Sequence, residues 1–325
     1  MATTMRAIVQ DGYGVPERVL RLDEIARPPV GPGGVLVRVR ATSVNTPDWA
    51  TVAGVPYAFR LRSGPRRPSR RVRGSDVAGV VEAVGPEVTD LAPGDEVLGS
   101  LWEGAGAFAE YAVVPAAQLV RKPAGLGFEE AAASVMTGLA ALIAMRDTGR
   151  VGAGTRVLVN GASGGVGTMA VQIAKSLGAE VTGVCGPRNA ALVRSLGADR
   201  VIDYTERDFT RSAERYDVVL DNVLNHPSAA TARLLAPDGV LIPNSIGNSG
   251  GLLGALPRVA RAALRRDVKL VTLAVNRENL DALVRLLESG AVRVVIDRTY
   301  PLEEAAVAVA HMLGHHASGK IAITV

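Results

Sequence analysis

Residues 157–167 read VLVNGASGGVG, and this stretch decides the fold. An apolar strand runs directly into a glycine-rich loop, and the helix predicted after the loop carries apolar residues at Met169, Ala170, Ile173 and Ala174. Glycines let a backbone approach a phosphate closely, and the first turn of a helix supplies unpaired amide donors at the positive end of its dipole. Strand, loop and helix in this order therefore predict the phosphate-binding turn of a doubly wound α/β unit.

The same alternation of strands and helices extends along the chain after the loop. When single helices separate successive strands, the strands pair in parallel through right-handed crossovers. We expect strands at 156–160, 180–185, 200–203, 216–221 and 240–244, with helices at 165–177, 189–196 and 227–235. An Ala-rich helix at 129–146, interrupted near Thr137 and Gly138, is expected to precede them. This part of the chain is predicted to form a Rossmann unit.

The first third of the chain has a different texture. Residues 5–11, 35–42 and 76–84 read as β-rich segments between Gly/Pro turns, and no convincing helix appears before residue 128. Near the C-terminus we expect a helix at 278–288, a short strand near Val294, a helix at 302–312 and an apolar strand at 320–325 that returns to the first domain. The predicted domains are therefore 1–123 with 275–325, which is β-rich, and 124–274, which is the Rossmann unit.

Composition narrows the class of protein. A chain of 325 residues with 48% hydrophobic and 21% charged residues is typical of a globular protein of two domains. No run of about 18 apolar residues predicts a membrane span, and the N-terminus has no signal-like core, so we expect a cytoplasmic protein. Cys185 is the one cysteine, which excludes an internal disulfide and a multi-cysteine zinc site. Although the pI is 9.4, the net charge is only +4, so nucleic acid is not an expected partner.

The second strand of the Rossmann unit ends in a loop that predicts the choice of cofactor. Sites that prefer NAD place Asp or Glu there to bind the ribose 2′-hydroxyl, whereas residues 184–189 read VCGPRN and contain neither. Arg188 instead offers a guanidinium suited to a 2′-phosphate, which predicts NADPH. Tyr204, at the end of the third strand, is placed to stack on the adenine or bind that phosphate. The residues expected to hold the adenosine and pyrophosphate are Ser163, Gly164, Gly165, Val166, Gly186, Arg188, Asn189 and Tyr204.

Several short motifs occur in a fixed order along nearly the whole chain. They are SVNTPD at 43–48, GSDVAG at 74–79, PGDEV at 93–97, GAFAEY at 106–111, NGASGGVG at 160–167, LGAD at 196–199, VIDY at 201–204 and GKI at 319–321. With these motifs the chain resembles the zinc-less medium-chain dehydrogenase/reductases, in the branch of the NADPH:quinone oxidoreductases and enone reductases.

The resemblance implies a GroES-like catalytic domain built from both chain ends around a Rossmann domain, with the active site in the cleft between them. It places Asn45 and Asp48 on the catalytic-domain wall that faces the nicotinamide, and Tyr57 near a tyrosine that lines the substrate pocket in several relatives. It also implies that residues after later strands hold the nicotinamide half of the cofactor, namely Asn222, Val223, Asn244, Ser245 and Ile246.

Two departures from the wider family bear on the chemistry. Zinc-dependent relatives use Cys and His ligands where this chain has Asn45 and Gly74-Ser75-Asp76, so no metal is expected and zinc polarisation of an alcohol is not predicted. Relatives often carry a threonine where this chain has Ala140, and Thr137 is the residue expected to compensate in placing the nicotinamide.

A reductase without zinc needs an acceptor that conjugation already activates, such as a quinone or an α,β-unsaturated carbonyl. The protein must then hold the acceptor and stabilise the oxygen on which charge develops. We expect Asn45 to donate a hydrogen bond to that oxygen, Tyr57 to donate a hydrogen bond or relay a proton, and Asp48 to orient its neighbours. The alternative readings are that Asn45 caps a turn and that Tyr57 only packs.

Other functions stay open from the sequence. The same scaffold serves biosynthetic reductases of secondary metabolism, and some relatives bind cofactor or RNA without turnover. Seven arginines between Arg60 and Arg73 fit either a solvated loop or a surface for an acidic ligand. An apolar strand expected at 269–275 would lie at a sheet edge, where isologous pairing with a second copy predicts a homodimer.

Overall fold

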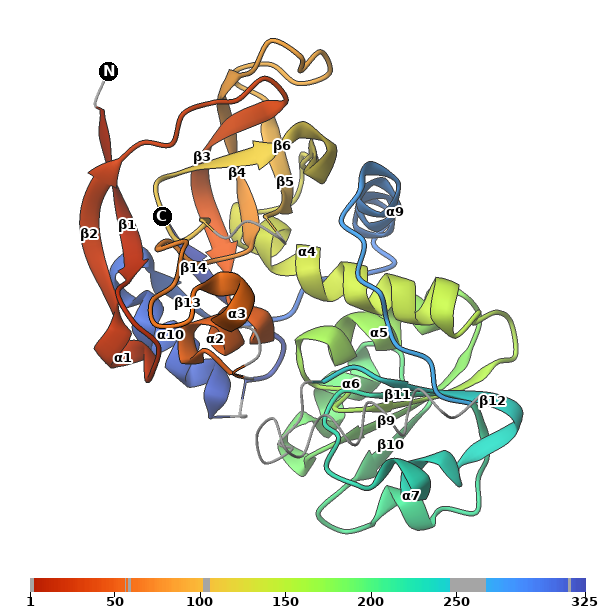
Figure 1. Ribbon diagram of the computed structural model, residues 1–325. Coiled ribbons are helices and arrows are strands. Elements are labelled where there is room, and N and C mark those ends of the chain that lie inside the picture. Colours follow the sequence, from red (N-terminus) through yellow and green to blue (C-terminus); the bar gives the residue numbers. More distant parts are fainter. Residues whose placement is uncertain (1–2, 56, 58–59, 102–105, 246–266, 315–316) are drawn as a thin grey trace. The chain divides into compact units, whose positions relative to one another are not determined.

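The chain forms two compact units. The computed structural model describes residues 3–55, 57, 60–101, 106–245, 267–314 and 317–325 (Figure 1). Unit 1 comprises Met1–Met136, Ala274–Glu288 and Ile296–Val325, and unit 2 comprises Thr137–Leu273 and Ser289–Val295. The division predicted after residue 123 differs from this one, because the units divide inside a helix and residues 289–295 belong to unit 2 rather than to the β-rich domain.

Within the described residues, unit 2 is built on a five-stranded parallel sheet (Figure 1). The strands lie in the order β10-β9-β8-β11-β12, and each pairing is parallel. Their bounds are β8 Arg156–Asn160, β9 Glu180–Cys185, β10 Arg200–Asp203, β11 Tyr216–Asp221 and β12 Leu235–Pro243. This order, with the first strand in the middle, confirms the predicted doubly wound sheet.

Helices connect these strands as the alternation predicts. α5 (Gly165–Ser176) packs against β8 and β9, α6 (Ala190–Ser195) against β9 and β10, and α7 (Ser228–Ala232) against β12. The residues of α5 from Gly167 to Ala174 are all buried, because this helix is covered on several sides.

The helix before the sheet is longer than expected. α4 (Phe128–Leu142) continues without interruption past Thr137 and Gly138, and a π-helical segment, Ile143–Thr148, extends it. The predicted break near Thr137 is therefore wrong, since burial of the Ala-rich helix outweighs the low helical propensity of one glycine. By length and composition the stretch Phe128–Thr148 would be able to cross a membrane, but 78% of its most apolar window is buried inside the protein, as in a core helix.

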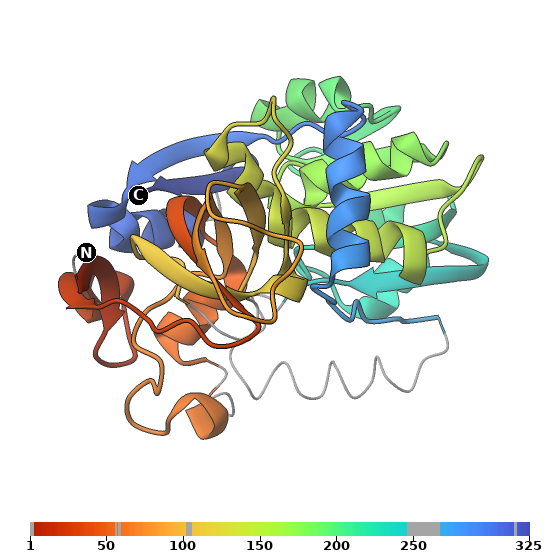
Figure 2. The same cartoon turned by 90° about the horizontal axis from the view of Figure 1, so that it is seen from above.

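Unit 1 is the β-rich domain, and its larger sheet joins both ends of the chain. The order is β13-β14-β3-β4-β5-β7, with β6 paired to β3, and a separate hairpin pairs β1 with β2. Figure 2 shows the C-terminal strands, in blue, beside the N-terminal part of this sheet. The bounds are β1 Thr4–Gln10, β2 Leu20–Ala26, β3 Gly34–Ser43, β4 Asp76–Val84, β5 Glu96–Ser100, β6 Tyr111–Pro115, β7 Leu119–Arg121, β13 Ile296–Pro301 and β14 Lys320–Thr324.

Alternating burial places the core of unit 1. Along β3 the side chains of Val35, Val37 and Val39 are buried while those of Arg38 and Arg40 are exposed, as the apolar and basic alternation predicts. The valines pack with apolar residues of β4, β5 and β6. β14 pairs antiparallel with the end of β3, which confirms that the last strand returns to the first domain.

Short helices complete unit 1, and in the described part of the chain three of them precede residue 128, where no helix of convincing length was expected. α2 (Thr46–Ala53) has eight residues, too few for a clear apolar period in the sequence. The others are α1 Pro16–Val19, α3 Arg60–Ser63, α9 Arg277–Glu288 and α10 Ala305–Leu313, with 3₁₀ turns at Ala116–Gln118 and Leu302–Glu304.

The expected strand at 269–275 is not formed. Val268 makes one parallel bridge to Leu241 of β12, and Lys269 donates its N–H to the Leu241 carbonyl at 3.0 Å, after which the backbone has no regular structure. The pairing ends there because only the first residues of the stretch follow the β12 edge.

Candidate active site

A buried polar cluster lies in unit 1 where β3, β4, β14 and α2 meet. Its members are Ser43, Asn45, Asp48, Ser75, Asp76 and Lys320, and each is at most 6% exposed. The two expected site residues Asn45 and Asp48 are therefore brought together.

Asn45 is the central residue of this polar cluster. Its Nδ2 donates to Asp76 Oδ2 at 2.8 Å and to Ser75 Oγ at 3.2 Å, and its Oδ1 accepts from Lys320 Nζ at 2.6 Å. An amide nitrogen has two hydrogens, so both are engaged. Asn45 would donate to a substrate oxygen only after releasing one partner, and the longer bond to Ser75 is the weaker of the two.

Asp48 holds the start of α2. Its Oδ2 accepts from the backbone N–H of Asn45 at 2.9 Å, as in a capping box, and from Ser75 Oγ at 3.3 Å. Burial raises the pKa of the Asp48 carboxyl from 3.8 to about 7, the charge of Asp76 adds to this, and Lys320 opposes it. These contacts fit the expected orienting role.

Asp76 and Lys320 share this buried environment. Ser43 Oγ donates to Asp76 Oδ2 at 2.6 Å, and Lys320 Nζ donates to the Val44 carbonyl at 2.7 Å. Burial raises the pKa of Asp76 although Lys320 opposes it, and burial lowers the pKa of Lys320 although both carboxylates oppose that. Sequence reasoning did not assign a site role to Lys320. The signal for it was a lysine that opens an otherwise apolar strand, KIAIT.

Tyr57 has a different environment. Its side chain is 63% exposed, and the guanidinium of Arg60 lies 4.6 Å from the centre of its ring. The ring therefore packs against a cation at the surface, and none of the hydrogen bonds described above reaches it.

Unit 2 carries the nucleotide loop at the carboxyl end of β8. Gly161 has a left-handed backbone, with φ of 76°, and the N–H groups of Gly161 and Ala162 donate to the Val184 carbonyl at 3.1 and 3.0 Å. A Cβ on Gly167 would lie 2.0 Å from the Gly161 carbonyl oxygen, so α5 starts against this loop only with glycine there. The first turn of α5 leaves N–H groups at Gly165 and Val166 for a ligand phosphate.

The loop after β9 carries the residues expected to hold an adenosine 2′-phosphate. Arg188 is exposed on a 3₁₀ turn, Pro187–Asn189, and the Tyr204 hydroxyl lies beside Gly186, 3.2 Å from where a Cβ on that glycine would be. The nearest carboxylate on the next strand, Asp203, accepts from the N–H and hydroxyl of Thr205 at 2.9 and 2.8 Å. Asp203 is thus already engaged in its own turn.

Two of the residues expected to hold the nicotinamide half, Asn222 and Asn244, form an amide network with Asn160 at the carboxyl ends of β8, β11 and β12. Asn222 Nδ2 donates to the Asn160 carbonyl at 3.2 Å, and Asn244 Nδ2 donates to Asn222 Oδ1 at 2.9 Å. The buried carboxylate of Asp221, which was not among the expected site residues, accepts from Asn160 Nδ2 at 2.8 Å and from the Val223 N–H at 3.1 Å. Val223 would therefore contact a ligand through its carbonyl or side chain.

Two more of the expected residues, Ser245 and Thr137, belong to unit 2. Ser245 follows β12 and is half-buried, and Thr137 lies within α4 and is 7% exposed. Ile246 lies outside the described residues.

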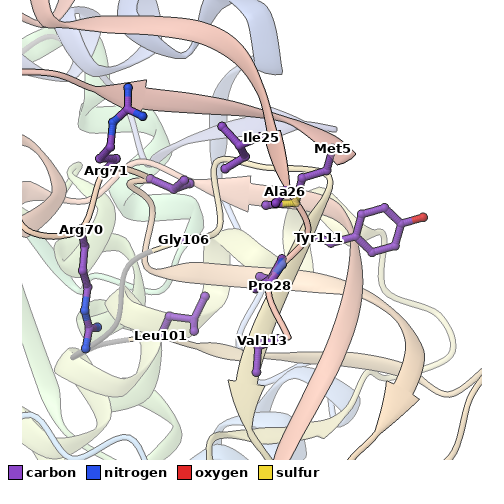
Figure 3. A pocket seen from close by; sticks show the side chains of 12 residues that line it. Met5, Ile25, Ala26, Pro28, Arg70, Arg71, Leu101, Gly106, Tyr111 and Val113 are labelled. Carbon is purple, nitrogen blue, oxygen red and sulfur yellow. The ribbon is translucent and has the colours of Figure 1, made fainter. Parts of the chain in front are cut away.

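A pocket of about 270 Å³ lies elsewhere in unit 1. Figure 3 shows Met5, Ile25, Leu101 and Val113 around it, with Arg70 on one side. None of the expected site residues lines it.

The donor set of the polar cluster does not fit a zinc ion. An ammonium group, Lys320 Nζ, already occupies the cation position at Asn45 Oδ1, and the single cysteine lies on β9 of unit 2. Among the residues that the structure describes, no three His, Cys, Asp or Glu side chains gather in a group that would hold a metal.

Two family models match the chain. One is described as an alcohol dehydrogenase GroES-like domain and matches residues 31–124, and the other, described as a zinc-binding dehydrogenase, matches residues 196–323. The chloroplastic quinone-oxidoreductase QR1 of Triphysaria versicolor is 34% identical over 329 residues, 98% of each chain.

Solved structures of quinone oxidoreductases also match the chain over nearly its full length. The quinone oxidoreductase of Coxiella burnetii matches with a TM-score of 0.87 and 28% identity, over 99% of each chain. The Escherichia coli quinone oxidoreductase, solved in complex with NADPH, matches with a TM-score of 0.82 and 27% identity, over 98% of this chain and 100% of the other. With a GroES-like unit, a Rossmann unit and full-length relatives of this kind, the chain belongs to the medium-chain dehydrogenase/reductase family, in its quinone oxidoreductase branch.

Proposed function

We propose that the chain is an NADPH-dependent oxidoreductase that transfers hydride to a quinone or an α,β-unsaturated carbonyl without zinc. The observation that carries the proposal is the polar cluster of unit 1, in which Asn45 is held by Lys320 instead of standing among metal ligands. Without a Lewis acid, the acceptor must already be activated by conjugation.

The nucleotide loop supports NADPH as the reductant. Bound reduced nicotinamide supplies the hydride. Arg188 and Tyr204 would hold the 2′-phosphate, the first turn of α5 the pyrophosphate, and the amide network around Asn222 the nicotinamide half. A free carboxylate here would favour NADH, but the carboxylate of Asp203 is occupied by its contacts with Thr205.

The chain's own residues then have separate tasks. We assign to Asn45 the stabilisation of the acceptor oxygen, by exchanging its Ser75 contact for one to the substrate. Asp48 orients Asn45 and α2. Tyr57 is the proposed proton donor for enones, whereas a quinol oxygen takes its proton readily from water.

The test is steady-state oxidation of NADPH by the purified chain with one small para-quinone and one acyclic enone, before and after treatment with a chelator. We expect turnover of both acceptors, unchanged by the chelator. Loss of activity on chelation and its return with zinc would overturn zinc independence. Oxidation of a saturated alcohol without reduction of either acceptor would replace the proposal with alcohol dehydrogenation.

A second candidate is a dedicated biosynthetic reductase that acts on an enoyl group carried by coenzyme A or a carrier protein. The exposed arginines Arg66, Arg67 and Arg70 favour it, because they offer charge to the phosphates of such a carrier. Comparison of an enoyl thioester of coenzyme A with the same enone lacking the carrier separates the two. A preference for the thioester that disappears in an Arg66→Ala/Arg67→Ala variant would favour the second candidate.

A further inference from the structure

We propose that the Lys320 ammonium is the built-in cation of the polar cluster and that it sets the direction of the Asn45 amide, which makes Lys320 a positioning residue for reduction of the acceptor. The expected effect on turnover rests on the function proposed above. The structural part of the proposal is independent of that function.

Strand pairing brings Lys320 to Asn45 from the far end of the chain. In the β14–β3 ladder Ala322 is paired with Ser43, and the Val44 N–H donates to the Ile321 carbonyl at 3.0 Å. Lys320, the first residue of β14, therefore lies alongside residues 44 and 45, just past the end of β3. Its side chain donates to both, to Val44 O at 2.7 Å and to Asn45 Oδ1 at 2.6 Å.

The chemistry of the partners permits one orientation of the amide. Oδ1 faces an ammonium, which only donates, and Nδ2 faces Asp76 Oδ2, which accepts in its ionised form. If the amide turned over, a donor would face a donor and an acceptor would face an acceptor. Lys320 thus fixes the direction in which both Nδ2 hydrogens of Asn45 point, including the hydrogen that Asn45 donates to Ser75 Oγ.

Lys320 also offsets the charge of the cluster. Asp48 and Asp76 are both buried, and the charge of Lys320 lowers the pKa of each against the effect of burial. Among the described residues, Arg73 is another cation near enough for the charge of Asp48 to raise its pKa, although burial lowers that pKa overall. A divalent metal would have to displace the ammonium from Asn45.

The sign of the pH effect follows from these shifts. The folded-state pKa of Asp48, about 7, lies above its ordinary value of 3.8, so the folded protein keeps a proton that the unfolded chain loses. The free energy of unfolding therefore falls as pH rises between these two values. Removing Lys320 raises the pKa of Asp48 further, so this fall extends to higher pH. The pKa of Lys320 is lowered in the fold, so in the wild type this lysine makes the free energy of unfolding rise with pH above its folded-state pKa. A variant without the lysine lacks that rise, which also lowers its relative stability at high pH.

The experiment compares Lys320→Met, Lys320→Gln and the matched control Lys122→Met. Lys122 is another lysine of unit 1 with a side chain 3% exposed. It donates to the backbone carbonyls of Pro123 and Leu126 and pairs with the half-exposed carboxylate of Glu96 at 2.9 Å. Four quantities are measured for each variant: kcat with an enone, the NADPH Kd, the pH profile of kcat, and Tm as a function of pH.

We expect Lys320→Met to lower kcat by about tenfold to a hundredfold, less than the loss of a donor that touches the oxyanion itself. The NADPH Kd should stay within about twofold, and the inflections of kcat and of Tm should both move to higher pH. Lys320→Gln keeps a neutral donor, so its kcat should recover most of the loss while its inflections still move. Lys122→Met should have a lower Tm, with the inflections of kcat and of Tm at the wild-type pH.

A folded Lys320→Met variant with the wild-type kcat and the wild-type inflections would overturn the proposal, as would an equal shift in Lys122→Met. If Lys320→Met does not fold, Lys320→Gln carries the test, and an unmoved Tm inflection there contradicts it. If the wild-type chain reduces neither acceptor, the proposed function fails, and the Tm comparison still decides whether Lys320 is the cation of the cluster.

Discussion

At the scale of single residues, Arg188 is the residue on which we expect the choice between the two nicotinamide cofactors to depend. It stands exposed on the turn after β9, two residues after Gly186, and the Tyr204 hydroxyl lies beside that glycine. A charge-assisted contact to a 2′-phosphate supplies the about 1.4 kcal/mol that a tenfold preference requires. We therefore expect NADPH to bind at least about tenfold more tightly than NADH.

Titration calorimetry with both cofactors on the wild type and on Arg188→Ala checks this prediction. The variant should lose most of the preference by weakening NADPH and leaving NADH nearly unchanged. Arg233→Ala, an exposed arginine of the same unit, is the control and should keep it. Equal affinities in the wild type, or an unaltered preference in Arg188→Ala, would show that the phosphate is not recognised at this turn.

Asn45 is the residue on which turnover is expected to depend. Asn45→Ala removes the proposed donor to the developing oxyanion, and it also leaves Lys320, Ser75 and Asp76 each short of a partner. We expect kcat/KM for an enone or quinone to fall by about tenfold to a few hundredfold, with the NADPH Kd hardly changed.

The control for Asn45→Ala is Asn279→Ala, a buried asparagine of α9 that donates to the Ala274 carbonyl. It should cost stability of the same order without lowering kcat/KM. If Asn45→Ala shows wild-type kinetics with both acceptors, Asn45 has no catalytic role.

At the scale of elements, the junction of β8 and α5 depends on close backbone contact. A Cβ at Gly167 would lie 2.0 Å from the Gly161 carbonyl oxygen and 2.8 Å from backbone atoms of Ala162, none of which is a flexible side-chain end. Gly167→Ala must therefore displace the first turn of α5 from the loop. We expect a loss of about 1–3 kcal/mol in the free energy of unfolding and weaker NADPH binding.

Gly152→Ala is the matched control, because nothing lies within 4 Å of the Cβ it would add. It should be neutral or stabilise by up to about 1 kcal/mol through the unfolded chain. Chemical denaturation of both variants, with the NADPH Kd measured alongside, separates the two outcomes. A Gly167→Ala variant as stable as Gly152→Ala, with normal NADPH affinity, would contradict the close packing of loop and helix.

At the scale of the whole molecule, the segment after Val268 bears on assembly. Leu270 is 52% exposed in an apolar stretch that leaves the edge strand β12 after one bridge. An exposed apolar segment at a sheet edge is stabilised when it pairs with its copy across a two-fold axis. We therefore propose a homodimer in which residues 269–275 become ordered as a strand.

Light scattering at micromolar protein should give the mass of a dimer for the wild type and a lower mass for Leu270→Asp. Leu61→Asp, which alters a leucine 82% exposed in unit 1, is the control and should not change the mass. A monomeric wild type would refute the dimer, and a dimer that survives Leu270→Asp would place the interface elsewhere.

The sequence by itself determined the elements that depend on local pattern. The strands at 156–160, 180–185, 200–203 and 216–221 were predicted at their observed bounds, because short apolar runs bounded by turn residues indicate strands directly. It also determined the nucleotide loop, since glycine spacing and a following helix are local features. The doubly wound sheet and the family follow from these patterns and from the motifs along the chain.

Only the tertiary structure decided which side chains meet. Lys320 and Asn45 are 275 residues apart, and the register of β14 against β3 brings them within 2.6 Å. Burial keeps α4 helical through Gly138. Both Nδ2 hydrogens of Asn45, which we expected from the sequence to be available to a substrate, are bound by Ser75 and Asp76. Periodicity reports which face of an element is buried, whereas the partner and charge of a buried polar group depend on contacts that only the folded chain creates.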